Sequence, residues 1–132
     1  MVKTLAIASV AALVVLLGQA PVRAHHSLNA EFDTQKEIVM KGVLTKVDNV
    51  NPHSWWYFDV KEADGKVTSW KLEALAPAGL IRQGLKLKTE VKMGDEYQVR
   101  IHPALKDTPG KEKLGFMKAI TVNGKEYIVI EA

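Results

Sequence analysis

Four histidines are the first candidates for chemistry in this sequence of 132 residues, which contains no cysteine. His25 and His26 are adjacent, His53 follows an asparagine–proline pair, and His102 precedes a proline. Without cysteine the chain has no disulfides, no thiolate metal sites, no haem attachment through C-x-x-C-H and no cysteine nucleophile. Imidazole nitrogens, in contrast, are ligands for zinc, copper, iron and nickel. The histidines are therefore the candidate metal ligands.

The first 24 residues predict a secretory signal sequence. Lys3 supplies a positive charge, residues 5–17 form a charge-free apolar run, and residues 18–24 are mostly small or polar. A bilayer span needs about 20 apolar residues, and this run has 13, so an uncleaved membrane anchor is the less favoured alternative. We therefore expect a periplasmic or secreted protein with no membrane span after cleavage.

Cleavage after Ala24 would make His25 the first residue of the mature protein. Signal peptidase prefers small side chains three residues and one residue before the cut, and Val22 and Ala24 meet this requirement. A cut after Ala20 would put Pro21 directly after the bond, where its missing N–H and fixed φ make a poor substrate. The sequence therefore predicts a mature chain that begins with a histidine.

An N-terminal histidine is a chelating ligand. His25 would bind a metal through its α-amine and its ring Nδ1 together, and one further imidazole would complete a T-shaped set of three nitrogens, a histidine brace. Copper(II) prefers tetragonal, nitrogen-rich sites and stands at the top of the affinity order of divalent metals. The α-amine has a pKa of about 7.7–8.0, against about 10.4 for lysine, so a metal displaces its proton near neutral pH at modest cost. We therefore expect copper(II).

The other three histidines are candidates for the second imidazole. His53 is the first choice because it follows a proline at the start of an expected strand. His26 is available locally but would leave the site loosely held, and the position of His102 depends on the topology of the fold. Two alternatives stay open. The histidines are solvated or cap backbone groups, or they hold zinc, which is less favoured because tetrahedral zinc sites use fixed side chains.

Polar side chains in the same region are candidates to orient a ligand ring. Asn51, Asp59 and Glu31 are expected in this role, which is common around metal-bound histidines. Asp59 and Glu73 are also expected to face each other across a hairpin, where solvated surface charges explain them equally well. No nucleophile elbow and no glycine-rich phosphate loop occurs, and no substrate cleft is evident for redox chemistry at a copper ion, so the sequence does not indicate an enzyme.

The mature chain carries little net charge. Loss of Lys3 and Arg23 lowers the number of basic residues from 18 to 16 against 15 acidic ones, and the formal net charge falls from +3 to +1. No basic run or stripe remains to neutralise phosphates. We therefore expect no nucleic-acid partner.

Apolar and polar residues alternate over most of the mature chain, which is the period of β-strands. Six strands and one short helix are expected, with the helix at residues 77–83 between the third and fourth strands. An Asp-Gly pair at 64–65 and an Asn-Gly pair at 123–124 predict two-residue type I′ hairpin turns, and Gly42 indicates a bend or bulge in the first strand. The expected strands are residues 37–48, 54–62, 66–73, 96–102, 116–122 and 127–130.

This order of elements predicts the fold and the domains. Three strands, a short helix and two or three further strands are the element order of an OB-type barrel, with another small β-sandwich or roll as the alternative. We expect a mostly β, OB-like barrel of five to six strands with one short helix. The chain would then consist of a signal peptide at residues 1–24, an N-terminal arm at 25–36 and a barrel domain at 37–132.

The second strand carries a row of aromatic residues. Alternation puts Trp56 and Phe58 on the more apolar face, which we expect in the core, and puts Trp55 and Tyr57 on the outer face with His53. OB barrels bind ligands on the outer face of this strand, and flat amphipathic rings stack on sugars, bases or partner side chains. Trp55 and Tyr57 are therefore candidate ligand-binding residues, unless the arm or the helix covers them.

Several motifs occur together over the mature chain: Ala24-His25-His26-Ser27, Glu31-Phe32-Asp33, Asn51-Pro52-His53 with a tryptophan behind it, the hairpin at 64–65, the helix at 77–84 and Met93-Gly94-Asp95-Glu96. Together they resemble a family of small, exported bacterial proteins known as a domain of unknown function. The two histidine motifs are the most specific. The chain departs from the family pattern at Leu28, where an aromatic residue is common, and at residues 85–90. The resemblance implies export and a compact β fold, and it implies no reaction.

The sequence therefore favours an exported, non-enzymatic binding protein that captures copper(II) through His25, with His53 as the first choice for a further ligand. Storage, delivery or protection of the envelope would be its purpose. The alternative is an interaction module that uses Trp55 and Tyr57 to hold an envelope ligand or protein.

Overall fold

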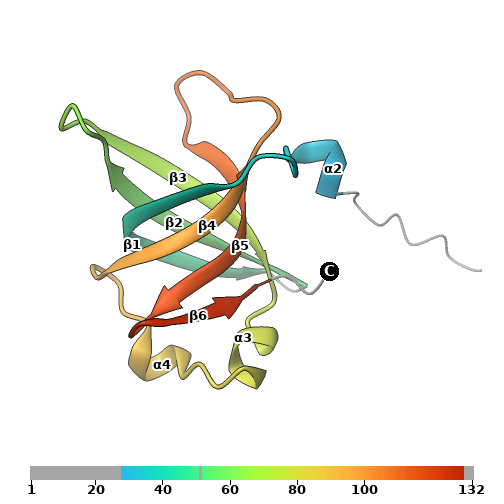
Figure 1. Cartoon of the computed structure of the whole chain (residues 1–132), viewed down its shortest axis with the longest axis vertical. Helices are drawn as coiled ribbons and strands as arrows, with labels where there is room; N and C mark the ends of the chain where they lie inside the picture. Colours follow the sequence, from blue (N-terminus) through green and yellow to red (C-terminus); the bar gives the residue numbers. More distant parts are fainter. Residues whose placement is uncertain (1–27, 51, 130–132) are drawn as a thin grey trace, which may run out of the picture.

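The computed structural model describes residues 28–50 and 52–129, and this part of the chain contains six strands and three short helices (Figure 1). The mostly β class and the number of strands are those expected from the sequence. The strands are β1 (Ile38–Val50), β2 (His53–Lys61), β3 (Val67–Leu75), β4 (Glu96–Pro103), β5 (Lys113–Val122) and β6 (Lys125–Ile128). The helices are α2 (Leu28–Glu31), α3 (Ala78–Arg82) and α4 (Leu87–Glu90).

Five of the strands close into a barrel. β1 pairs with β4 along its first half and with β2 along its second half, and all these pairings are antiparallel. β2 pairs with β3 and β4 pairs with β5, again antiparallel. β3 and β5 run parallel and close the ring, from Trp70 beside Lys113 to Glu73 beside Phe116. β6 joins β5 outside the ring, so the expected OB-like barrel is confirmed, with one additional strand.

A β-bulge lets β1 serve two neighbours. The register with β2 shifts just after Leu44, which leaves Thr45 as the extra residue of the bulge. Leu44 faces the core before the bulge, and Val47 packs against the core after it. The bulge therefore lies at Thr45 and not at Gly42, and Val47 is not on the face of Val43, where an uninterrupted two-residue alternation over residues 37–48 would put it.

Gly42 has a different role, which is to let β1 approach β2 closely. A Cβ atom at this position would lie 3.0 Å from Cγ2 of Val60 and 3.1 Å from Cβ of Phe58. A side chain here would therefore push the two strands apart, and the absence of one keeps the barrel narrow.

The two hairpin turns differ in length. Between β5 and β6, Asn123 has φ 51° and Gly124 has φ 78°, which confirms the type I′ turn. Between β2 and β3, the Gly65 N–H donates to the Glu62 carbonyl (2.9 Å) and the Glu62 N–H donates to the Lys66 carbonyl (2.7 Å). These bonds enclose three residues, in a type I turn that ends on a left-handed glycine. The two-residue turn expected at this hairpin was therefore wrong.

The helices are each about one turn long. α3 begins after Pro77 and is followed by Gly84 with φ 99°, in agreement with the expected helix. α2 and α4 were not expected, so the prediction of a single short helix was wrong. In the α4 region Leu85 is buried and Leu87 is half-buried, and a helix of four residues is too short to show a helical period in the sequence. Figure 1 shows α3 and α4 together at one end of the barrel.

Alternate residues of the strands fill the barrel interior. Trp56 and Phe58 are each 1% exposed, which confirms the face of β2 expected in the core. Nε1 of Trp56 donates to Oγ of Ser54 (2.9 Å), and this hydroxyl donates to the Leu75 carbonyl (2.9 Å). The polar atom of the buried indole is therefore satisfied. The other large side chains that are fully buried are Leu44, Leu72, Leu85, Val99, Ile101, Met117, Ile120 and Val122.

The free edge of β6 is held by the side chain of Gln83. Its Nε2 donates to the Ile128 carbonyl (2.6 Å), and its Oε1 accepts a hydrogen bond from the Ile128 N–H (2.9 Å). Nε2 also donates to the Gly79 carbonyl within α3 (3.1 Å). The side-chain amide therefore pairs with β6 as a neighbouring strand would, and it ties α3 to the sheet.

Replacing this amide should destabilise the fold. Gln83→Ala is expected to lower the free energy of unfolding by about 1–3 kcal/mol, because two hydrogen bonds to β6 are lost and each contributes about 0.5–1.5 kcal/mol net. Urea unfolding measures the change. Gln98→Ala on β4 is the matched control, since Gln98 takes no part in this pairing, and its effect should stay within about 0.5 kcal/mol. Equal effects of the two variants would show that the pairing does not stabilise the protein.

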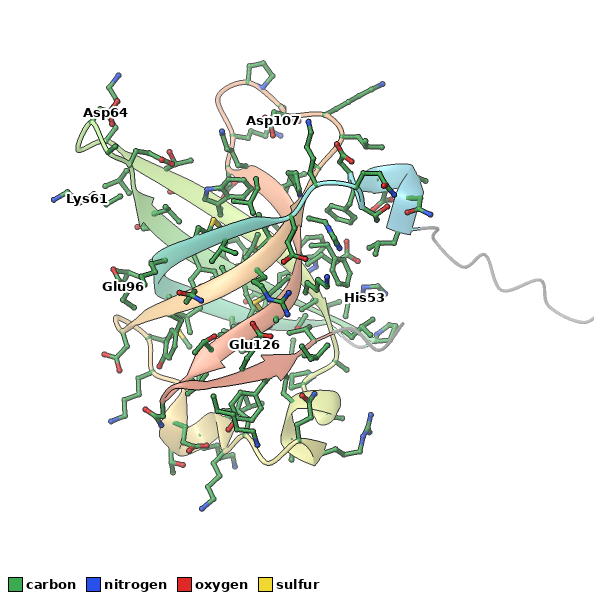
Figure 2. All side chains as sticks on the ribbon, in the orientation of Figure 1. His53, Lys61, Asp64, Glu96, Asp107 and Glu126 are labelled. Carbon is green, nitrogen blue, oxygen red and sulfur yellow. The ribbon has the colours of Figure 1, made fainter. Side chains whose placement is uncertain are left out.

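A charged network connects the residue before β1 with β4, β5 and β6. Glu37 accepts hydrogen bonds from Nη1 of Arg100 (3.0 Å) and from Nζ of Lys118 (2.7 Å). Arg100 also donates through Nε (2.8 Å) and Nη2 (2.6 Å) to the carboxylate of Glu126 on β6, labelled in Figure 2. The bonds from Lys118 and Arg100 lower the pKa of Glu37, and those to Glu126 and Glu37 raise the pKa of Arg100.

The contribution of this network should depend on pH. Because the pKa of Glu37 is lowered in the folded state, its stabilising effect is complete above the pKa of an unfolded glutamate, about 4.3, and is lost as the pH falls through the folded pKa. In urea unfolding, Glu37→Gln should therefore be less stable than the wild type near neutral pH, and the two proteins should converge in acid. If the difference in stability between the two proteins is the same in acid as near neutral pH, the charge of Glu37 does not stabilise the fold.

Candidate functional site

The N-terminal arm lies against the outside of the barrel. Phe32 forms a single bridge with Ala104 just beyond β4, and its ring meets Phe116 edge to face, with the ring centroids 5.6 Å apart. The Leu105 N–H donates to the Glu31 carbonyl (2.9 Å). Phe32 and Phe116 are both buried but lie outside the barrel core. They form a second, smaller apolar cluster that holds α2 in place.

A cavity of about 460 Å³ lies between this arm and the barrel. Its wall is mainly apolar but includes an indole from β2 and a carboxylate from β3. Ligand pockets in proteins commonly have volumes of about 300–1,000 Å³, so the cavity can hold a small molecule. The residues around it are Ala30, Glu31, Phe32, Trp55, Glu73, Ala104, Leu105, Lys106 and Leu114.

Strand register places two residues of the cavity wall, Trp55 and Glu73, in one row with Phe116 and His102. Trp55 pairs with Glu73, Glu73 pairs with Phe116, and Phe116 pairs with His102. Residues directly opposite each other on neighbouring strands share a face of the sheet. The four side chains therefore form a row across the outside of β2, β3, β5 and β4, and the cavity lies over the β2 end of this row.

His53 stands at the start of β2, two residues before Trp55 and on the same face. Its Nδ1 lies 2.6 Å from Oε1 of Glu73, and the two side chains are 37% and 14% exposed. Nδ1 itself is buried, and the carboxylate oxygen lies away from the direction of the ring N–H, so the contact is close but bent. Glu73 therefore occupies the Nδ1 side of the ring, which leaves Nε2 as the nitrogen for a further ligand.

His102 has a structural contact. Its Nδ1 lies 2.7 Å from the carbonyl oxygen of Lys36, and the residue is 8% exposed. The ring therefore joins the end of the arm to β4. His102 and Glu73 are two strands apart in the row, about 10 Å at the usual strand spacing, so the fold does not place His102 beside the His53–Glu73 pair.

The two candidate aromatic residues have different surroundings. Both are half-buried on the outer face of β2, as expected, but only Trp55 lines the cavity beside the arm. Nζ of Lys71 lies 4.4 Å from the ring centroid of Trp55 and 5.8 Å from that of Tyr57. Nζ of Lys46 lies 5.2 Å from the centroid of Tyr57. The ring of Tyr57 is therefore flanked by cations of the protein itself.

The carboxylates are arranged differently from the expectation. Asp59 pairs with Ser69 across the hairpin and accepts a hydrogen bond from its hydroxyl (2.9 Å). Glu73 pairs with Trp55 instead, so the expected pair of Asp59 and Glu73 was wrong. The residue that contacts the His53 ring is Glu73, which the sequence did not identify in this role. Glu31 lies in the wall of the same cavity.

Comparison with known proteins gives a family. The family model described as Family of unknown function (DUF6152) matches residues 12–112. The chain belongs to this family. No curated protein matches the chain. The expected resemblance to an uncharacterised domain family is thereby confirmed, and in this member of the family the matched part covers the arm, the barrel as far as β4 and the loop before β5.

Several predicted features of this family member lie outside the described residues: the signal sequence, His25, His26 and Asn51. Within residues 28–50 and 52–129 there is no group of three or more histidine, aspartate or glutamate side chains that would hold a metal ion. None of the helices in that part of the chain is both long and apolar enough to cross a membrane.

Proposed function

We propose that the mature protein captures copper(II) in the periplasm or outside the cell, with the N-terminal His25 and His53 as ligands. The observation that carries the proposal is the contact of Glu73 with Nδ1 of His53, 2.6 Å apart. Histidines that bind metals commonly direct their other ring nitrogen to a carboxylate, which fixes the ring and raises its basicity. The carboxylate of Glu73 lies beside Nδ1 of His53, and a straight hydrogen bond between the two would give His53 this arrangement.

The position of the arm supports a site shared with the N-terminus. Leu28 begins α2, and α2 lies against the barrel at the cavity that Glu73 also lines. Three residues span at most about 10 Å, and this is the reach from Leu28 that the proposal gives His25. Because the arm is anchored through Phe32, the cost of bringing an N-terminal ligand toward His53 is smaller than for a free tail.

The ligand set favours copper over zinc. An α-amine and two imidazoles supply three nitrogens without a carboxylate or thiolate, which suits a tetragonal copper(II) site. A structural zinc site would need four fixed ligands. In this proposal the copper is the cargo of the protein, and Glu73 acts on it only through the ring of His53.

A copper titration of signal-cleaved protein tests the role of His53. His53→Ala is expected to weaken copper(II) binding by more than about 100-fold, and Glu73→Gln by about 10–100-fold, the usual effect of losing the partner of a metal-bound histidine. His102→Asn is the control, because its ring contacts the Lys36 carbonyl and not the proposed site. Competition with a chelator of known affinity measures each constant. A wild-type affinity in the His53 variant would exclude it as a ligand.

A further inference from the structure

The cavity beneath the arm has the composition of a site for an organic molecule, independently of any metal. Its volume is about 460 Å³, enough for a molecule of one ring with a short side chain. Phe32, Leu105 and Leu114 contribute apolar wall, and Trp55 contributes a flat aromatic one. Apolar walls with a few polar groups are typical of small-molecule pockets, so the polar groups decide which molecule fits.

Glu73 is the polar group of the wall whose acceptor capacity is least used. Its side chain is 14% exposed, and its close polar neighbour is Nδ1 of His53, in a bent contact. A carboxylate can accept about four hydrogen bonds, and a charge removed from water is costly unless it is paired and hydrogen-bonded. A positively charged donor in the cavity would supply both the charge and the missing bonds.

The remaining groups favour the same charge. Glu31 adds a second carboxylate to the wall, and the one cationic side chain, Lys106, is exposed at the rim, where solvent and salt screen its charge. The ammonium group of Lys71 lies 4.4 Å from the ring centroid of Trp55, a cation–π contact, so a ligand would meet this indole with its apolar body and not with its charge. The cavity therefore complements a cation that carries an apolar group.

We propose that this cavity binds a small organic ammonium compound, a primary amine with an aromatic or branched aliphatic body. The ammonium group would donate to the carboxylate of Glu73, and the body would lie against Trp55 and Leu114. The sequence suggested an interaction module that uses Trp55 and Tyr57. This proposal narrows that alternative to a small-molecule site that includes Trp55 but not Tyr57. It does not depend on copper binding, because neither His25 nor a metal takes part.

Three probes with the same ring distinguish the charge that the cavity accepts: 2-phenylethylammonium, 2-phenylethanol and phenylacetate. Each is titrated into signal-cleaved protein in the presence of a chelator that removes metals, and backbone amide shifts in NMR spectra report the site. We expect 2-phenylethylammonium to bind at least tenfold more tightly than the other two, with the largest shifts at Trp55 and Leu114. Equal affinities, tighter binding of phenylacetate, no binding of any probe, or shifts elsewhere would overturn the proposal.

Two matched variants test whether the carboxylate of Glu73 is the group that binds the ammonium probe. Glu73→Gln is expected to weaken binding of the ammonium probe at least tenfold and to leave binding of the alcohol unchanged. Asp59→Asn, on the same face of β2 but away from the cavity, should change neither. An unaltered ammonium affinity in Glu73→Gln would contradict the proposed contact. If the protein does not bind copper(II), the expected binding of the ammonium probe is unchanged. If it does not bind the ammonium probe, the expected binding of copper(II) is unchanged.

Discussion

Acetylation of the α-amine of His25 is expected to weaken copper(II) binding by more than about 100-fold. The acetyl group turns the amine into an amide, so the amine and the ring of His25 can no longer bind the metal together as a chelate. Loss of an outer partner of a metal ligand costs about 10–100-fold, and loss of a direct chelate should cost more. A competition titration with and without the acetyl group, on protein whose N-terminus is checked by mass, measures the change.

His25→Ala complements this experiment because it keeps the free α-amine and removes the ring. It is expected to bind copper(II) as weakly as the acetylated protein, since each change removes one half of the chelate. His26→Ala is the control for local binding, and it should keep most of the affinity. If His26→Ala instead abolishes binding while His53→Ala does not, the copper is held by the N-terminal pair alone and the barrel takes no part.

Trp56→Ala is expected to lower the free energy of unfolding by about 3–5 kcal/mol, the usual cost of truncating a fully buried tryptophan. Trp56 is 1% exposed in the middle of β2, and its removal also leaves Ser54 without the indole donor. No neighbouring side chain can fill the space, because the opposite positions of β1 and β3 are already packed around it. Urea or thermal unfolding of the cleaved protein gives the measurement.

The adjacent tryptophan is the matched control. Trp55 lies on the outer face, where its known partner is the ammonium group of Lys71, and an exposed cation–π contact contributes about 0.5–1 kcal/mol. Trp55→Ala should therefore cost about 1 kcal/mol, far less than Trp56→Ala. Similar losses from the two variants would show that the faces of β2 are assigned wrongly.

The sequence alone was sufficient to predict which side of β2 faces the core. The strand is regular, so a two-residue period carries through from Ser54 to Val60 without interruption. The same argument failed in β1, because the bulge at Thr45 inserts one residue and moves Val47 to the inner face. A bulge depends on the strands on both sides of β1, and a local pattern does not contain that information.

One residue in a hairpin loop explains why Glu73 was not recognised as the partner of His53. The expected two-residue loop would place Ala74 opposite Trp55, whereas the three-residue loop that ends at Gly65 places Glu73 there. A shift of one residue turns every side chain of a strand to the other face of the sheet. The register of β3, and with it the site, therefore depended on a turn whose length the Asp-Gly pair did not determine.

The arm was predicted as a segment, but its contacts were not. Phe32 meets Phe116 and the Lys36 carbonyl meets His102 across separations of more than 60 residues. No short-range pattern encodes such contacts, since they arise only after the barrel has closed. The cavity between arm and barrel was missed for the same reason, and with it the space beside Trp55 that a small molecule can occupy.

The most direct test of copper capture is electron paramagnetic resonance of signal-cleaved protein with one equivalent of copper(II). We expect one tetragonal species with hyperfine coupling to at least three nitrogens, among them the α-amine and the ring of His25. In His53→Ala the coupling of one imidazole nitrogen should disappear. Identical spectra of the wild type and His53→Ala, with the same affinity, would show that the barrel supplies no ligand and would contradict the proposed site.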